Sequence, residues 1–238
     1  MSIILAIETS SEMASCALLR GDTVLFRESS GVRTHSQSIL PMVQELLAEA
    51  GIVLKECSAI AFGAGPGSFT GVRTACGIAQ GLAYGAGLPV LPLITLEAMA
   101  VACRQQHGAT DVVAVLDARM GEVYWAQYHY DDGAARWDVL AAPTLCAPDA
   151  VAPLPVAGPL AACGNGLAAY PDAFGAQAFA RAYPAIMPHA AQMALLGRSA
   201  LAAGAAVGAA QAQPLYLRNK IAYTSAERSV INAAKAAA

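Results

Sequence analysis

Residues 111–117 read DVVAVLD, an apolar run that ends in an acid, and the chain opens on the same pattern at residues 3–8, IILAIE. Short continuous apolar runs of this kind are typical of strands buried on both faces. Asp117 lies 109 positions after Glu8, and in both places two further strand-like segments and a tight turn follow in the same order. This equal order and spacing favours an internal duplication over chance alternation.

Strand and helix patterns alternate through the rest of the chain. The expected strands are 3–8, 14–19, 23–28, 59–63, 89–93, 111–117, 123–130 and 135–140, and the expected helices are 37–50, 70–85, 95–106 and 188–203. Five prolines between 143 and 159 predict an extended connection there, and a strand with a glycine-rich turn is expected within 155–170. We therefore predict two α/β domains around a cleft, residues 1–108 and 109–222, followed by a helical or disordered tail over 223–238.

Composition limits the classes of function. The chain of 238 residues is 56% hydrophobic and 13% charged, with a net charge of −3 and three lysines. A protein that grips nucleic acid unaided usually carries a basic stripe, and the sequence shows none. We expect any work on RNA to need a partner that supplies the positive surface.

The cysteines and the N-terminus bear on location. The six cysteines are at least 17 residues apart, without a C-x-x-C pair, so neither zinc binding nor thioredoxin-like chemistry is indicated. Residues 1–10, MSIILAIETS, lack the basic start and cleavage site of a signal peptide, which favours the cytoplasm. The uncharged stretch 74–96 contains Pro89 and Pro92, so it predicts a buried helix and strand rather than a membrane span.

A glycine-rich loop follows the strand expected at 59–63. Residues 63–77 read GAGPGSFTGVRTACG, which matches neither a P-loop, nor the dinucleotide fingerprint, nor a nucleophile elbow. Two interpretations stay open: an anion cradle at a helix N-terminus, or a tight strand-to-helix turn without a ligand. If an anion or a nucleotide binds, its candidate contacts are Glu8, Thr9, Ser10, Gly65, Gly67 and Ser68.

Two acids end the opening strands of the two halves. Glu8 and Asp117 would face one cleft, where paired carboxylates hold magnesium or act as acid and base. Glu8 is one methylene longer than the aspartate usual in this role, which argues against tight metal geometry. The four histidines show no metal-binding spacing. We expect no metal and no cofactor, with nucleotide or magnesium as the less favoured alternative.

A row of glycines marks one helix face. Gly77, Gly81 and Gly85 are spaced by four, and each costs roughly 1 kcal/mol relative to alanine inside a helix. A backbone must therefore come close there, either within the chain or from another subunit. The helix at 37–50 has apolar residues on more than one side. Together the two helices predict an interface for a partner, with these candidate residues: Leu40, Met42, Val43, Gly77, Gly81 and Gly85.

Five segments between residues 4 and 222 are distinctive: ILAIETS (4–10), HSQSILPMV (35–43), GAGPGSFTGVRTACGIAQGLA (63–83), DARMGEVYWAQY (117–128) and PLYLRNKIA (214–222). Together they resemble the TsaB (YeaZ) family of tRNA threonylcarbamoyladenosine biosynthesis proteins. The glycine-loop segment and DARMGEVY are the specific ones. The resemblance implies two RNase H-like domains of the type found in actin, Hsp70 and sugar kinases.

The resemblance also implies a role without catalysis. Members of the family pair with the paralogue TsaD, which transfers threonylcarbamoyl to the tRNA adenosine 3′ of the anticodon, while the ATPase TsaE joins the complex and TsaC-type enzymes supply the activated intermediate. The catalytic paralogue binds its metal through two histidines whose positions fall here on Thr95 and Met99. We therefore expect no catalytic residues, self-pairing when the partner is missing, and contact with tRNA only through the complex.

Two other classes stay open at this stage. A small-molecule phosphotransferase would share the fold, and ATP turnover by the pure protein would reveal it. A metallopeptidase-like protein would need metal ligands, which metal analysis of the purified protein would detect.

Overall fold

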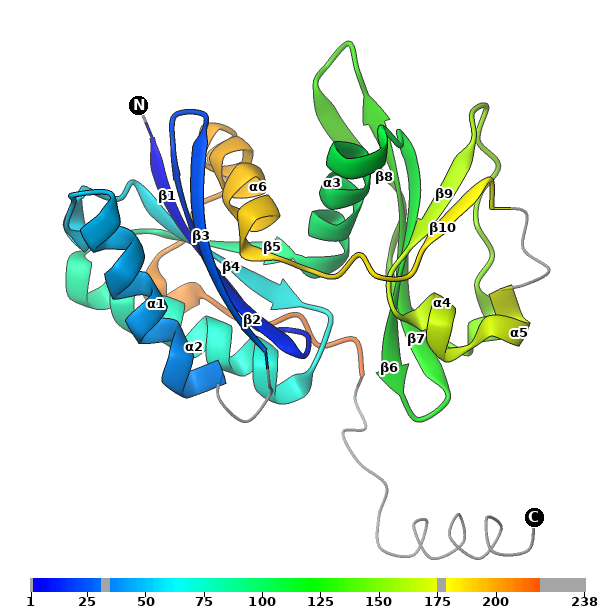
Figure 1. Ribbon diagram of the computed structural model, residues 1–238, viewed down its shortest axis with the longest axis horizontal. Helices are drawn as coiled ribbons and strands as arrows, with labels where there is room; N and C mark the ends of the chain where they lie inside the picture. The colour runs from blue at the N-terminus through cyan, green and yellow to red at the C-terminus, as the bar shows by residue number, and fades with distance from the viewer. Residues whose placement is uncertain (1, 31–34, 175–178, 219–238) are drawn as a thin grey trace, which may run out of the picture.

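Two α/β halves lie side by side in the computed structural model, which describes residues 2–30, 35–174 and 179–218 (Figure 1). Each half is built on one five-stranded sheet. The predicted tail at 223–238 lies outside the described residues.

The first half contains the sheet β3-β2-β1-β4-β5. Its strands are β1 (Ile3–Glu8), β2 (Met13–Arg20), β3 (Thr23–Ser30), β4 (Ala59–Gly65) and β5 (Val90–Ile94). The helices α1 (His35–Glu49) and α2 (Phe69–Ala86) cover one face, and α6 (Ala190–Ala202) covers the other. Side chains of β1 alternate accordingly, because Leu5 and Ile7 pack under α1 and α2 while Ile4 and Ala6 pack under α6.

The second half repeats this arrangement in the sheet β8-β7-β6-β9-β10. Its strands are β6 (Asp111–Arg119), β7 (Glu122–Asp131), β8 (Arg136–Cys146), β9 (Leu160–Cys163) and β10 (Arg181–Tyr183). In both sheets the first strand pairs antiparallel with the second and parallel with the fourth. The predicted duplication requires this shared topology.

Helices of the second half cover its sheet unequally. One face carries α3 (Thr95–His107), and the short helices α4 (Gly166–Ala169) and α5 (Pro171–Phe174) pack with the apolar cluster on the other. Single turns of 3₁₀-helix occur at Leu54–Glu56, Pro148–Ala150 and Ala209–Gln211, named η2, η3 and η4.

One helix from each part of the chain packs on the sheet of the other part. Leu96, Met99 and Cys103 of α3 belong to the core of the second sheet, although α3 follows β5 of the first. Conversely, Met193 and Ala194 of α6 lie in the core of the first sheet. A division of the chain at 108/109 therefore separates the two sheets but not the helices that cover them.

Several expected boundaries change. The third strand of the second half extends to Cys146, beyond the predicted end at 140, and β10, α4 and α5 were not predicted. Elements of three or four residues are too short to show a period in the sequence. Among the described helices, none combines the length and the apolar character needed to cross a membrane.

Candidate functional site

The glycine-rich loop between β4 and α2 packs against the turn that follows β1. The backbone N–H of Ser68 donates to the carbonyl of Ser10 at 2.7 Å, and the Thr9 hydroxyl donates to the carbonyl of Gly71 at 2.7 Å. The Ser68 hydroxyl caps α2 by accepting from the N–H of Gly71. Thr95 donates its hydroxyl to the carbonyl of Pro66. The loop is thus a strand-to-helix turn whose glycines allow two backbones to touch.

The six candidate nucleotide or anion contacts do not all lie at the same place in the structure. Ser10, Gly67 and Ser68 line a cleft of about 470 Å³ between the two halves. Glu8 and Thr9 are fully buried, and Gly65 lies under the carbonyl of Leu215. A contact of all six with one ligand remains a prediction, and only three of them face the cleft.

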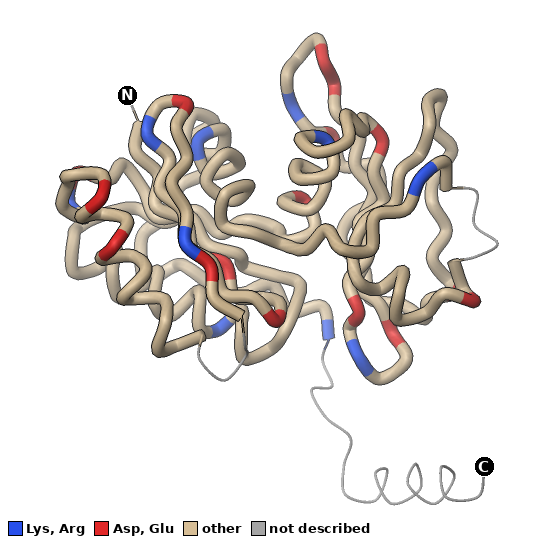
Figure 2. Tube along the Cα trace, in the orientation of Figure 1, with Lys and Arg blue, Asp and Glu red and all other residues tan. Residues whose placement is uncertain are grey.

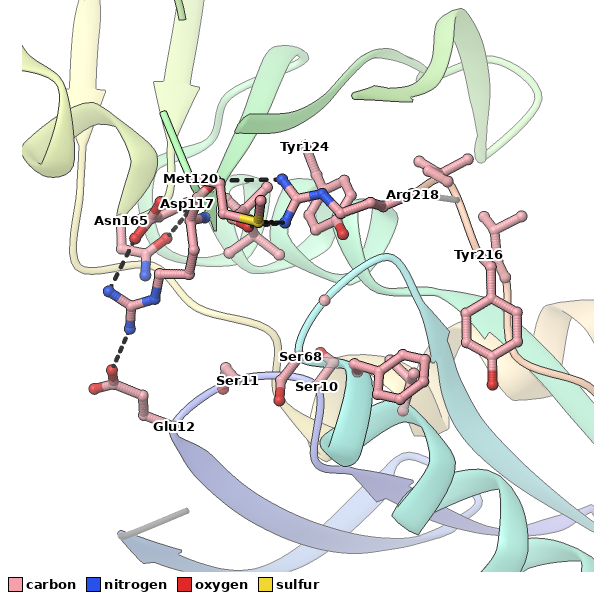
Figure 3. A pocket seen from close by; sticks show the side chains of 18 of the residues that line it. Ser10, Ser11, Glu12, Ser68, Asp117, Met120, Tyr124, Asn165, Tyr216 and Arg218 are labelled. Atoms are coloured by element: carbon pink, nitrogen blue, oxygen red, sulfur yellow. Dashed lines mark hydrogen bonds and ion pairs between the residues drawn. The ribbon is translucent and has the colours of Figure 1, made fainter. Parts of the chain in front are cut away.

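The second half supplies the opposite wall of the cleft from the end of β6 and the β6–β7 turn (Figure 3). The Asp117 carboxylate accepts from the Tyr170 hydroxyl at 3.0 Å and lies 3.1 Å from the Arg119 guanidinium. Asn165 accepts from the backbone N–H of Asp117 at 2.9 Å. Asp117 is therefore held by partners of its own half.

Glu8 does not fit the magnesium–nucleotide site that this fold would imply. Its side chain is 0% exposed, Oε1 accepts from the N–H of Ser10, and Oε2 is buried without a hydrogen-bond partner. Oε2 occupies the space where Gly63 would carry a Cβ atom. Burial raises the pKa of Glu8 to about 7. A carboxyl directed into the β1–β4 region cannot meet Asp117, and the described residues contain no metal-binding cluster of three or more acids, histidines or cysteines.

The raised pKa of Glu8 predicts a pH dependence of stability. Below about pH 4.5 the carboxyl is protonated in both the folded and the unfolded chain. As the pH rises from there to about 7, the unfolded chain loses this proton first, so the free energy of unfolding falls by roughly 3 kcal/mol. Glu8→Gln stays neutral, and urea unfolding between pH 4.5 and 8 should show that it lacks this decline. Equal slopes in the two proteins would contradict the assignment.

The predicted interface residues on α2 are open. Gly77, Gly81 and Gly85 are exposed, and a methyl group on any of them would meet no other described segment within 4 Å. Tyr84 beside them is 84% exposed. Among the described residues, no close packing within the chain explains the glycine row.

The predicted interface residues on α1 need a correction. Leu40 is 45% exposed, as the interface requires, but Met42 and Val43 are buried in the core under the first sheet. Met42 follows Ile39 by three positions and Val43 by four, so all three lie on the inner stripe of the helix. Of the three candidate residues on α1, only Leu40 has an exposed side chain.

Comparison with known proteins assigns the family. The chain is 41% identical to the tRNA threonylcarbamoyladenosine biosynthesis protein TsaB of Escherichia coli, over 92% of this chain and 96% of the relative. It is 39% identical to the TsaB of Haemophilus influenzae, over 92% of this chain and 95% of the relative. The chain belongs to the TsaB family. The family model described as "TsaD: tRNA N6-adenosine threonylcarbamoyltransferase" also matches residues 27–237.

Solved structures agree with this membership of the TsaB family. YeaZ from Pseudomonas aeruginosa is 39% identical and covers 91% of this chain and 100% of its own, with a TM-score of 0.86. A second Pseudomonas aeruginosa structure, an uncharacterized protein with similarity to peptidase YeaZ, has the same TM-score at 40% identity, over 92% of this chain and all of its own. The predicted fold class, two RNase H-like domains of the actin, Hsp70 and sugar-kinase type, is thereby confirmed, as is the resemblance to TsaB.

Proposed function

We propose that this chain is the non-catalytic, activating subunit of the bacterial complex that adds threonylcarbamoyl to the tRNA adenosine 3′ of the anticodon. The observation that carries the proposal is the open face of α1 and α2 on a chain whose relatives are named for this biosynthesis. An activating subunit needs a docking face more than a reactive site. Such a function places the chain in the cytoplasm, where tRNA is modified.

Two positions support the absence of turnover. Thr95 and Met99 stand where the resemblance places the metal-binding histidines of the catalytic paralogue, and both are 0% exposed. Thr95 donates to the carbonyl of Pro66, and Met99 packs in the core of the second half. Neither side chain type replaces histidine as a ligand, so we assign transfer to the TsaD-like partner.

The charge distribution supports contact with tRNA through the complex. The net charge is −3, and arginines and lysines are scattered over the described chain instead of forming a stripe (Figure 2). Several of these arginines are paired with acids, as Arg27 is with Glu45 and Glu49. Tight binding of nucleic acid depends on several clustered cations that displace counterions. The positive surface for tRNA then belongs to a partner.

The partners we propose are a TsaD-like catalytic subunit on the α1–α2 face and a TsaE-like ATPase that joins the pair. Because two subunits that share a fold pair by pseudo-twofold symmetry, the same face would join two copies of this chain when the partner is missing. We assign no metal or nucleotide to this chain, since Glu8 is buried and does not line the cleft, while the Asp117 carboxylate, which does line it, is already bound by Tyr170 and Arg119.

The test is reconstitution. tRNA, threonine, bicarbonate and ATP are incubated with a TsaC-type enzyme and with every combination of this chain, the TsaD-like subunit and the TsaE-like ATPase, and the modified nucleoside is measured by mass spectrometry. We expect no product with this chain as the sole additional protein and full activity only when all three are present. Modification by this chain without the TsaD-like subunit would refute the proposal, as would undiminished activity in its absence.

A further inference from the structure

Residues 212–218, here called the strap, pass from the first half of the molecule to the second and form one wall of the cleft (Figure 1). The strap begins on the first half. The carbonyl of Ala212 accepts from the Gln80 amide at 3.0 Å and from the Cys76 thiol at 3.6 Å, and the N–H of Leu215 donates to the carbonyl of Ala64 at 2.8 Å. Ala212 is 3% exposed and belongs to the core under α2.

Tyr216 extends this attachment along α2. Its hydroxyl accepts from Nε of Arg73 at 2.7 Å, and its ring lies 5.9 Å from that of Phe69. The Arg73 guanidinium stacks 3.6 Å from the centre of the Phe69 ring. The strap therefore contacts the first turn of α2 as well as its middle.

The strap ends on the second half, through one arginine. Arg218 donates to the carbonyls of Ala118 at 2.8 Å and Arg119 at 3.2 Å, and it forms an ion pair with Glu122 at 2.5 Å. The guanidinium also lies 3.6 Å from the sulfur of Met120 (Figure 3). Arg119 and Met120 have φ of 62° and 61°, a left-handed turn. The Arg218 side chain is 14% exposed, and its guanidinium binds both carbonyls and the Glu122 carboxylate around this turn.

A second tie across the cleft is much weaker. Arg119 of the second half lies 3.0 Å from Glu12 of the first, but their side chains are 71% and 75% exposed. Ion pairs between side chains this exposed contribute little to stability, whereas hydrogen bonds of a sheltered charged group are stronger. Of these two ties at the cleft, the strap is therefore the stronger.

We propose that the strap is a latch: it joins α2 to the β6–β7 turn, holds the two halves at one fixed separation, and makes the cleft a rigid joint rather than one that closes on a ligand. Each end is anchored by polar contacts to a different half, which a loose terminal segment would not show. Because Arg73, Cys76 and Gln80 lie on α2, the latch also fixes the helix that carries the open glycine row. This inference concerns the isolated chain and does not depend on its proposed function.

The test uses the full chain with Arg218→Ala, which removes the hydrogen bonds to Ala118 and Arg119, the contact with Met120 and the ion pair with Glu122. We call residues 10–12 and 118–121 the two lips of the cleft. Hydrogen exchange should become at least tenfold faster in peptides from each lip and from the strap, since all three segments open together. We also expect one calorimetric transition for the unmodified chain and two for Arg218→Ala. Arg218→Lys retains a charge for Glu122 but loses the planar fork, and an intermediate effect is expected.

Arg136→Ala is the matched control, because Arg136 pairs with Asp138 at 3.2 Å on the same half and touches neither the strap nor the cleft. Its exchange and calorimetry should match those of the unmodified chain. If Arg218→Ala and Arg218→Lys both behave like this control, the strap is not a latch. Slower exchange on both lips of the unmodified cleft when magnesium and ATP are added would equally overturn the proposal, since a latched cleft cannot close.

Discussion

Gly71→Ala should unfold at a temperature roughly 6 to 12 °C below that of the unmodified protein, a loss of about 3 kcal/mol or more. A Cβ atom on Gly71 would overlap the carbonyl oxygen of Thr9 and lie 2.9 Å from the Thr9 carbonyl carbon and 3.2 Å from Cα of Ser10. All three are backbone atoms, so no side chain can turn aside. The overlap outweighs the gain of about 1 kcal/mol that alanine brings to a helix. Thermal unfolding followed by circular dichroism measures the difference.

Gly81→Ala on the same helix is the matched control, with the opposite sign. No described segment lies within 4 Å of the added methyl group, so only helix propensity acts. We expect a gain of about 1 kcal/mol, or roughly 2 to 4 °C. Should Gly71→Ala prove as stable as the unmodified protein, the first turn of α2 would not rest on the β1–β2 turn, and the account of the glycine loop would be wrong.

The contrast between Gly71 and Gly81 on α2 shows which features of the glycine-rich loop can be predicted from the sequence and which cannot. The pattern predicted a helix at 70–85 after a strand at 59–63, and both exist with shifted ends. Composition left an anion cradle and a tight turn equally open, because glycine serves both. The structure shows that Gly71 lies against the backbone of Thr9, whereas a Cβ atom on Gly77 would meet no other described segment within 4 Å, and anion binding stays a prediction. Such contacts join positions about 60 residues apart, and no local pattern records them.

The repeated strands were predictable, in contrast, because the pattern that indicates them is local. Periodicity in β1 and β6 is local, and the equal offset of their acids indicated two related sheets. The packing of α3 on the second sheet and of α6 on the first was not predictable. An apolar stripe indicates that a helix packs on a sheet, but it does not indicate on which one. Arg218 was missed as a structural residue for the same reason. It lies in the segment 214–222, PLYLRNKIA, and its partners at 118–122 lie about 100 positions away in the sequence.

His35 is another residue whose place depends on contacts far along the chain. It begins α1 with 4% exposure, and its ring nitrogen Nε2 lies 3.2 Å from the carbonyl of Glu12. The turn after β1 thus contacts α1 as well as α2. Together with Met42 and Val43, this residue shows that α1 presents a narrower outer surface than its composition suggested.

Gly81→Leu should leave the chain folded and weaken its assembly with a TsaD-like subunit by roughly five- to 150-fold in Kd, the equivalent of about 1–3 kcal/mol. The glycine row allows a partner helix to approach below the usual 8–10 Å separation, and a leucine at its centre would hold that helix away. Self-pairing should weaken in parallel, because it uses the same face. Calorimetric titration measures the affinity, and size exclusion with light scattering measures the self-association.

The structure makes this test decisive because the substitution has no internal cost. Gly81 is exposed and has open space above it, so leucine improves helix propensity without disturbing the core. Gln106→Leu on α3 is the matched control: it adds a leucine to an exposed helix position of the other half and should change neither assembly. If Gly81→Leu binds the partner and itself as tightly as Gln106→Leu does, the partner surface lies elsewhere. The exposed Tyr84 and Leu40 would then need another explanation.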